Sequence, residues 1–111
     1  MGAFAIGSSD AADKLGLVMS AIADALRARP GAVVIRGHTD SRPYRRSGYD
    51  NWQLSFDRAQ TGFTGLVRGG LDERRIERVE AYADRRPKNV TAPQAPENRR
   101  IEILLRKQGP S

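Results

Sequence analysis

The 111-residue sequence contains no cysteine, which excludes disulfide bonds and every metal site built on thiolate ligands. No apolar run approaches the roughly 18 residues that a membrane-spanning helix requires. The first ten residues also lack the basic start and the apolar core of a signal peptide. If the protein is exported or anchored in a membrane, we expect the responsible segment to lie outside this sequence.

Basic residues are abundant. Hydrophobic residues make up 39% of the chain and charged residues 29%, which is typical of one folded domain, assigned here to residues 1–111, and not of a disordered chain. The formal net charge is +6. A basic surface attracts polyanions such as nucleic acid, anionic lipid head groups or acidic polymers, or it is a solvated surface without a specific partner.

The first two thirds of the chain alternate between helical and strand patterns. A helix that ends at Pro30-Gly31 is predicted from an apolar stripe of Leu15, Val18, Met19, Ile22 and Leu26. A buried strand follows over residues 32–35, between glycines. Asp50 and Gln53 have the spacing of a capping box at the start of a second helix. The apolar stripe predicted for that helix comprises Trp52, Phe56, Ala59, Phe63, Leu66 and Val67.

The remaining segments complete a sheet. Residues 71–87 fit a helix or a strand, and the prolines that follow predict a loop over residues 88–97. Ile101, Ile103 and Leu105 alternate with charged residues, which is typical of a half-buried strand. Residues 4–6 add a short edge strand. We therefore predict an α/β fold of two layers, with the helices packed on one face of a mixed sheet.

Catalysis and metal binding have little support in the sequence. The only histidine, His38, lies two residues before Asp40, but no nearby serine stands in the Gly-x-Ser-x-Gly turn of a nucleophile. These two side chains are also fewer than the three or four ligands of a zinc site. We therefore expect no catalytic residue and no metal, and we interpret His38 as a structural residue that bonds loop backbone.

Asp40 follows the buried strand, at the edge of an α/β sheet where ligands usually bind, and it faces the start of the second helix. Arg58 lies on that helix, off its apolar stripe. A carboxylate accepts hydrogen bonds from an ammonium group, and a guanidinium holds a carboxylate through two parallel bonds. Together the two residues fit a zwitterion, such as the end of an amino-acid side chain. Alternatively, they pair only with each other.

Three separated motifs stand out in the sequence: GHTD at 37–40, NWQLSFDRA at 51–59 and NRRI at 98–101. In this order they resemble the pattern of the OmpA-like peptidoglycan-binding domain, which is roughly GHTD, a loop, N-x-x-L-S-x-x-R-A, and N-R-R followed by a hydrophobic residue. The likeness extends over nearly the whole chain, from Phe4 to Arg106.

The resemblance implies a β-α-β-α-β-β fold, in which residues 76–82 form a strand, and a noncovalent binding function without a cofactor. In the family, the residue at the Asp40 position takes the amino group of diaminopimelate in the peptide stem of peptidoglycan. The residue at the Arg58 position takes the neighbouring carboxylate. The other positions that line or shape this groove correspond here to Thr39, Asn51, Leu54 and Arg100.

Within the family, DNWQLS at 50–55 and NRRIEILLR at 98–106 are most similar to the MotB type, in its alphaproteobacterial form. Such proteins anchor the flagellar motor stator to the cell wall. The likeness implies a periplasmic domain of an inner-membrane protein, a homodimer, and a MotA-like partner bound through an upstream segment. The first helix is the face where we expect the dimer contact. The alternatives are an envelope-tethering protein of OmpA or Pal type and, in another class, a basic nucleic-acid-binding module, although the sequence motifs of such modules are missing.

The chain departs from the family pattern in two loops. The family usually has glycine where this chain has Ala81 and Ala83, and alanine is expected to exclude a positive φ there. The loop over residues 41–49 is unusually basic, and its arginines either contact acidic stem carboxylates or are solvated: Arg42, Arg45 and Arg46. Arg99 and Arg100 also have a plainer interpretation, as exposed charges that open an edge strand.

Overall fold

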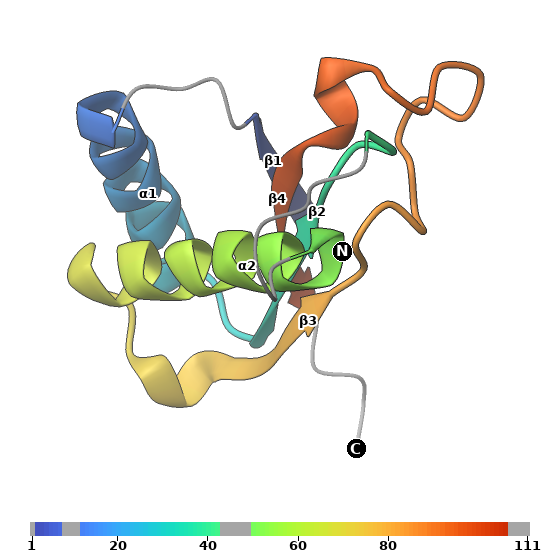
Figure 1. The fold of residues 1–111 in the computed structure, drawn as a ribbon. Helices are drawn as coiled ribbons and strands as arrows, with labels where there is room; N and C mark the ends of the chain where they lie inside the picture. Colours follow the sequence, from blue (N-terminus) through green and yellow to red (C-terminus); the bar gives the residue numbers. More distant parts are fainter. Residues whose placement is uncertain (1, 8–11, 43–49, 107–111) are drawn as a thin grey trace.

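The computed structural model describes residues 2–7, 12–42 and 50–106, so Arg45 and Arg46 lie outside the described residues. The elements follow one another in the order β-α-β-α-β-β (Figure 1), which confirms the predicted fold, including the strand expected near residues 76–82. They are β1 (Gly2–Gly7), α1 (Ala12–Arg27), β2 (Ala32–His38), α2 (Asn51–Arg68), β3 (Ile76–Ala81) and β4 (Arg100–Arg106), with 3-10 turns at Glu73–Arg75 and Pro96–Asn98.

The described strands form a mixed four-stranded sheet in the order β1-β4-β2-β3. β2 runs parallel to β3 and antiparallel to β4, and β1 is the antiparallel neighbour of β4. The edge strand predicted over residues 4–6 is thus confirmed as part of β1. The interpretation that Arg99 and Arg100 open an edge strand is wrong, because β4 lies between β1 and β2.

Both helices pack on the same face of the sheet (Figure 1), and the core lies between the two layers. Alternate residues of the central strands face the helices, and they are Val33, Ile35, Ile101, Ile103 and Leu105. The helices contribute Met19, Ile22, Ala23, Leu26, Ala59 and Leu66. The half-buried alternation predicted for the last strand is therefore confirmed. No helix in the described part of the chain is long and apolar enough to cross a membrane.

The second helix, α2, approaches β2 so closely that only small residues fit between them. A Cβ atom on Gly37 would lie 1.8 Å from the carbonyl oxygen of Ser55. The buried positions of the helix are accordingly small or lie further along it: Ser55, Ala59, Gly62 and Leu66. This contact brings the N-terminus of α2 beside the C-terminal end of β2, where the predicted site lies.

The apolar stripe predicted for α2 is only partly right. Trp52 and Phe56 are each 46% exposed, because the helical period places them on the flank of α2 and not on the narrow face that meets the sheet. The predicted start is confirmed, since the side chain of Asp50 accepts a hydrogen bond from the amide of Gln53 at 3.0 Å. The Gln53 side chain donates to Asp57 and does not close a capping box.

Beyond β3 the backbone turns through Ala83, whose φ is +50°. The expectation that alanine excludes a positive φ here is therefore wrong, although this conformation costs an L-residue free energy. The buried Ala83 connects two elements. Its amide donates to Ser55 Oγ at 3.0 Å, and its carbonyl accepts from the amide of Thr39 at 2.8 Å. The turn therefore holds the end of β2 against the start of α2.

Candidate functional site

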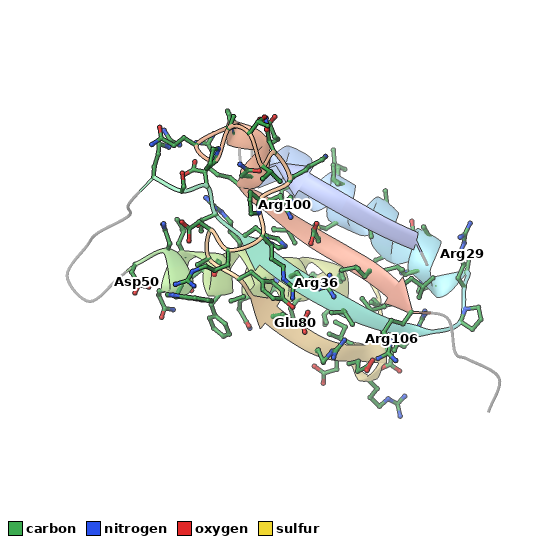
Figure 2. The ribbon with its side chains drawn as sticks, turned by 90° about the vertical axis from the view of Figure 1, so that its right-hand side faces the viewer. Arg29, Arg36, Asp50, Glu80, Arg100 and Arg106 are labelled. Carbon is green, nitrogen blue, oxygen red and sulfur yellow. The ribbon has the colours of Figure 1, made fainter. Side chains whose placement is uncertain are left out.

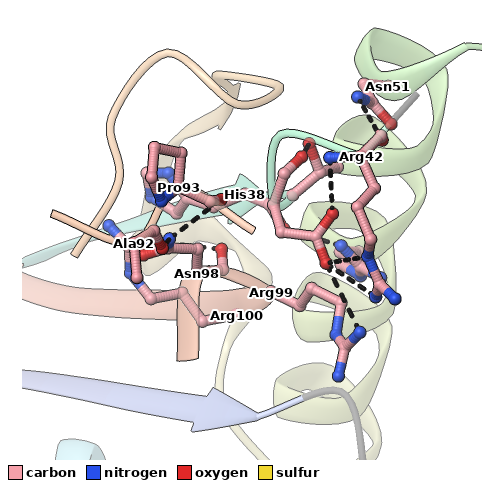
Figure 3. A network of polar contacts seen from close by, with 11 residues as sticks. His38, Arg42, Asn51, Ala92, Pro93, Asn98, Arg99 and Arg100 are labelled. Carbon is pink, nitrogen blue, oxygen red and sulfur yellow. Dashed lines mark hydrogen bonds and ion pairs between the residues drawn. The ribbon is translucent and has the colours of Figure 1, made fainter. Parts of the chain in front are cut away.

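The carboxylate of Asp40 lies buried just beyond the C-terminal end of β2, and only 5% of the residue is exposed. Its Oδ1 accepts from the backbone amide of Arg42 at 3.0 Å. Its Oδ2 accepts from Nη2 and Nε of the same arginine, at 2.9 and 3.2 Å, and from Arg99 Nη1 at 3.3 Å (Figure 3). Burial raises the pKa of Asp40, but these bonds and charges outweigh it and hold the pKa below its ordinary value. Asp40 is therefore ionised at neutral pH.

Arg58 reaches the same place from α2. Its Nη1 donates to the backbone carbonyl of His38 at 2.8 Å, which fixes the guanidinium at the end of β2. Burial lowers the pKa of Arg58 and the charge of Arg99 lowers it further, whereas Asp40 acts in the opposite direction. The fold thus brings Asp40 and Arg58 close enough to interact electrostatically.

The alternative in which Asp40 and Arg58 only pair with each other is wrong. These two described side chains form no direct ion pair, because Asp40 is neutralised by Arg42 and Arg99 instead. The guanidinium of Arg58 is held by a neutral backbone carbonyl. Its charge therefore has no carboxylate in direct contact among the described residues.

Three further predicted residues surround this pair. Thr39 is buried, and its hydroxyl donates to the carbonyl oxygen of the next residue at 3.0 Å. The side chain of Asn51 donates to the carbonyl of Arg42 at 3.1 Å, so it ties the start of α2 to the loop that follows β2. Leu54 is half-buried, and its spacing from Asn51 and Arg58 places all three on one side of α2.

Arg100 does not join this group. It is buried on the sheet face that is turned away from the helices (Figure 2), where its Nε donates to Glu102 at 3.0 Å and its Nη2 donates to the carbonyl of Arg86 at 3.0 Å. His38 lies on the same face, with Nε2 2.7 Å from Glu102 Oε1 and its ring stacked on Tyr82. The prediction that the His38 side chain bonds loop backbone is therefore wrong.

Arg99 is the neighbour of Asp40 that sequence reasoning missed. Residues of a strand alternate between its two faces, so Arg99 shares the side of Ile101, which faces the helices. Arg100 takes the opposite side. The alternation in the last motif was the available signal, because it assigns Arg99, and not Arg100, to the side on which Arg58 lies.

The site carries more positive than negative charge. One carboxylate, Asp40, is surrounded by the guanidinium groups of Arg42, Arg58 and Arg99, so these four side chains carry a net charge of +2. Such a cluster can accept an ammonium group at its single carboxylate and still offer guanidinium groups to carboxylates. Chemically, it suits a zwitterionic ligand, and above all one that carries additional carboxylates.

A separate groove of about 550 Å³ lies between α1 and α2. Its lining mixes apolar and polar side chains, including Leu15, Met19, Asp57, Thr64 and Arg68. Neither Asp40 nor Arg58 lines it. On the same helix, α1, Leu17 is 74% exposed and Val18 is also exposed. The groove is therefore a second surface feature and not the predicted site.

The chain is similar to known proteins over most of its length. The OmpA family model matches residues 3–101. Motility protein B of Escherichia coli strain K12 is 38% identical over 104 residues, which are 92% of this chain and 34% of that protein. A Pseudomonas aeruginosa structure, described as the cell wall anchor of the T6SS, is 37% identical with a TM-score of 0.70, over 92% of this chain and 73% of the other.

Solved domains of lower identity share the fold. The C-terminal domain of Helicobacter pylori MotB is 18% identical, and it superposes with a TM-score of 0.76 over 98% of this chain and 88% of that chain. The present chain spans about a third of the length of the curated Motility protein B sequences that it matches. The similarity therefore concerns one domain of those proteins.

Proposed function

Because this chain belongs to the OmpA family and is homologous to MotB, as its motifs predicted, we propose that it binds peptidoglycan noncovalently through Asp40 and Arg58. The observation that carries the proposal is the placement of a buried carboxylate and a guanidinium together at the C-terminal end of β2. The proposed ligand is diaminopimelate in the peptide stem, whose side chain ends in an ammonium group and a carboxylate.

In the proposed complex, the ammonium group of diaminopimelate donates to Asp40, and the adjacent carboxylate accepts from Arg58. Thr39 and Asn51 fix the backbone on either side of this pair, and Leu54 offers an apolar contact to the methylene groups of the ligand. Arg100 shapes the site indirectly, since it holds the carbonyl of Arg86 in the loop after β3.

At the level of the whole protein, we propose that the domain is periplasmic and anchors a MotB-like flagellar stator to the cell wall. The support is the 38% identity with Motility protein B of E. coli. An upstream segment would anchor the protein in the inner membrane and contact a MotA-like partner. A homodimer formed through α1 is part of the proposal, since Leu17 and Val18 leave apolar surface exposed on that helix.

The proposed role is binding and not catalysis. The only histidine is buried on the opposite face of the sheet from the helices, where it contacts Glu102 and Tyr82. It therefore does not present a general base to a ligand held between Asp40 and Arg58. Muropeptide turnover that is abolished by His38→Ala would contradict this statement.

Wall anchoring in a different assembly is the second candidate function. It is favoured by the 37% identity with the structure described as the cell wall anchor of the T6SS from P. aeruginosa. An envelope-tethering protein of OmpA or Pal type would use the same site. The upstream gene sequence separates the MotB type from the Pal type, because one transmembrane helix favours the first and a lipobox favours the second.

Co-sedimentation with purified diaminopimelate-type peptidoglycan at physiological salt tests the proposed site. We expect the wild-type chain to pellet, and Asp40→Ala and Arg58→Ala to remain in solution, because each variant leaves one end of the zwitterion unpaired, at a cost of about 1–3 kcal/mol. Arg74→Ala is the charge-matched control for Arg58→Ala, since Arg74 lies in the turn before β3 and pairs with Asp72.

Two results would contradict the proposed site. Full wall binding by a folded Asp40→Ala or Arg58→Ala variant would remove that residue from the site. Salt-sensitive binding to DNA, without retention on the wall at the same salt concentration, would favour the nucleic-acid alternative that the net charge of +6 suggested.

A further inference from the structure

Asp40 already has a cationic partner from its own loop. The guanidinium of Arg42 donates two hydrogen bonds to Oδ2, at 2.9 and 3.2 Å. This is the position that a ligand ammonium group would occupy, because an ammonium group also needs a carboxylate oxygen as its acceptor. A ligand that binds Asp40 must therefore compete with Arg42.

The two oxygens of Asp40 are held in different ways. Oδ1 accepts from the backbone amide of Arg42, and any residue except proline at position 42 supplies that bond. Oδ2 accepts only side-chain donors in the described structure, namely those of Arg42 and Arg99. The carboxylate therefore keeps its orientation when the Arg42 side chain moves away.

The two arginine side chains also differ in their freedom to leave. The side chain of Arg42 is 54% exposed, whereas that of Arg99 is 25% exposed. The exposed guanidinium of Arg42 is hydrated by solvent when it leaves, and the ammonium group of the ligand replaces it at the buried carboxylate of Asp40. Arg42 is therefore the partner of Asp40 that can be exchanged at low cost, and Arg99 is the one that stays.

We propose that Arg42 is an exchangeable counter-ion of the binding site, displaced from Asp40 by the ammonium group of the ligand. This inference rests on the proposed function, and it assigns specificity to a residue outside the family motifs. A ligand without an ammonium group leaves the pair of Asp40 and Arg42 intact and is disfavoured.

The chain contains a matched control for this pair. Arg74 donates from its backbone amide and its guanidinium to Asp72, in the same two-residue spacing as Arg42 and Asp40. That pair precedes β3, at the end of the parallel strands β2 and β3 opposite to Asp40. Arg74→Ala thus removes one charge and one local ion pair without touching the site.

The test is calorimetric titration with a stem tripeptide that ends in diaminopimelate, and with the same tripeptide that ends in lysine. We expect Arg42→Ala to bind the diaminopimelate peptide about two- to fivefold more tightly than wild type, or about 0.4–1 kcal/mol at 1.4 kcal/mol per tenfold. Arg42→Lys, which restores a competing cation, should return the affinity to the wild-type value. Arg74→Ala should not change it. The lysine peptide, which lacks the terminal carboxylate, should bind all variants weakly.

The outcomes separate this inference from the proposed function. If wild type binds the diaminopimelate peptide and Arg42→Ala binds it equally or more weakly, Arg42 is not displaced, and only the exchange is overturned. If neither wild type nor Arg42→Ala binds any stem peptide, the proposed function fails and the exchange falls with it. A second readout is the NMR signal of Arg42 Nε–H, which we expect to be protected in the free protein and to lose its protection on saturation with the peptide. Protection that persists would also overturn the exchange.

Discussion

The left-handed conformation of Ala83 has a testable effect on the free energy of unfolding, because the residue is buried and its φ is +50°. A left-handed conformation costs an L-residue roughly 1–2 kcal/mol, and glycine does not incur this cost. Ala83→Gly should remove the strain and keep both backbone hydrogen bonds. In these, the amide of residue 83 donates to Ser55 Oγ and its carbonyl accepts from the amide of Thr39.

Two losses oppose the gain. Glycine loses more backbone entropy on folding than alanine, by roughly 0.5–1 kcal/mol. The buried methyl group contributes about 0.8 kcal/mol. Together these losses nearly cancel the relief of strain, so Ala83→Gly should change the free energy of unfolding by less than about 1 kcal/mol. At a buried alanine in a helix, the same substitution should incur both losses without relief.

Urea unfolding of Ala83→Gly beside Ala59→Gly measures the strain directly. Ala59 is equally buried, on the helix face that meets the sheet. We expect Ala59→Gly to lower the free energy of unfolding by about 1.3–1.8 kcal/mol, from the same entropy and methyl terms. The difference between the variants should be about 1–2 kcal/mol in favour of Ala83→Gly. Equal destabilisation of both variants would refute the strained turn.

Two further predictions concern groups that support the site. Asn98→Ala should lower the free energy of unfolding in urea by about 2–4 kcal/mol. The buried Asn98 side chain bonds the amide of Asn89 and the carbonyls of Asn89, Ala92 and Pro93, and the substitution leaves these groups unpaired. A smaller loss would mean that water takes the place of the side-chain amide. Burial, and then the charge of Arg100, lower the pKa of His38, although Glu102 opposes them. As the pH falls, the unfolded chain therefore protonates His38 before the folded chain does. The free energy of unfolding should then decrease as the pH drops below about 6.5. Unfolding curves of wild type and His38→Gln between pH 7.5 and 5.5 check this, and an equal fall in both would contradict it.

The sequence allowed most of the elements and the positions of Asp40 and Arg58 to be predicted from local information, whereas the strand near residues 76–82 followed only from the family resemblance. Alternation in the last segment records which residues of β4 face the helices, and it was confirmed by burial of Ile101 and Ile103. The position of Asp40 after a strand, and of Arg58 two turns into a helix, follows from the lengths of those elements. Local periodicity therefore assigned the faces of β4 correctly, although it did not do so for all of α2.

The errors share a physical cause, which is contact between segments far apart in the chain. Trp52 and Phe56 were assigned to the core by size and period, but the close approach of Gly37 to Ser55 reserves that face for small residues. Ala83 adopts a positive φ, against the preference of alanine, where its backbone bonds Thr39 just after β2 and Ser55 of α2. The internal position of β4 likewise results from pairing with β1 and β2, which are distant from it in the chain.

The motif residues divide into those that present charge and those that hold backbone. Ser55, in the second motif, bonds the carbonyl of Trp52 and the amide of Ala83, and Asn98, in the third, gathers the loop before β4. Ser55 thereby holds the start of α2 against the turn that bonds Thr39, next to Asp40, and Asn98 orders the loop over residues 89–93. A motif match therefore predicts the geometry of the site more strongly than it predicts which ligands the site prefers. In the proposed exchange, ligand preference depends on the residues that compete for Asp40, and the more exposed of its two arginine partners, Arg42, lies outside every motif.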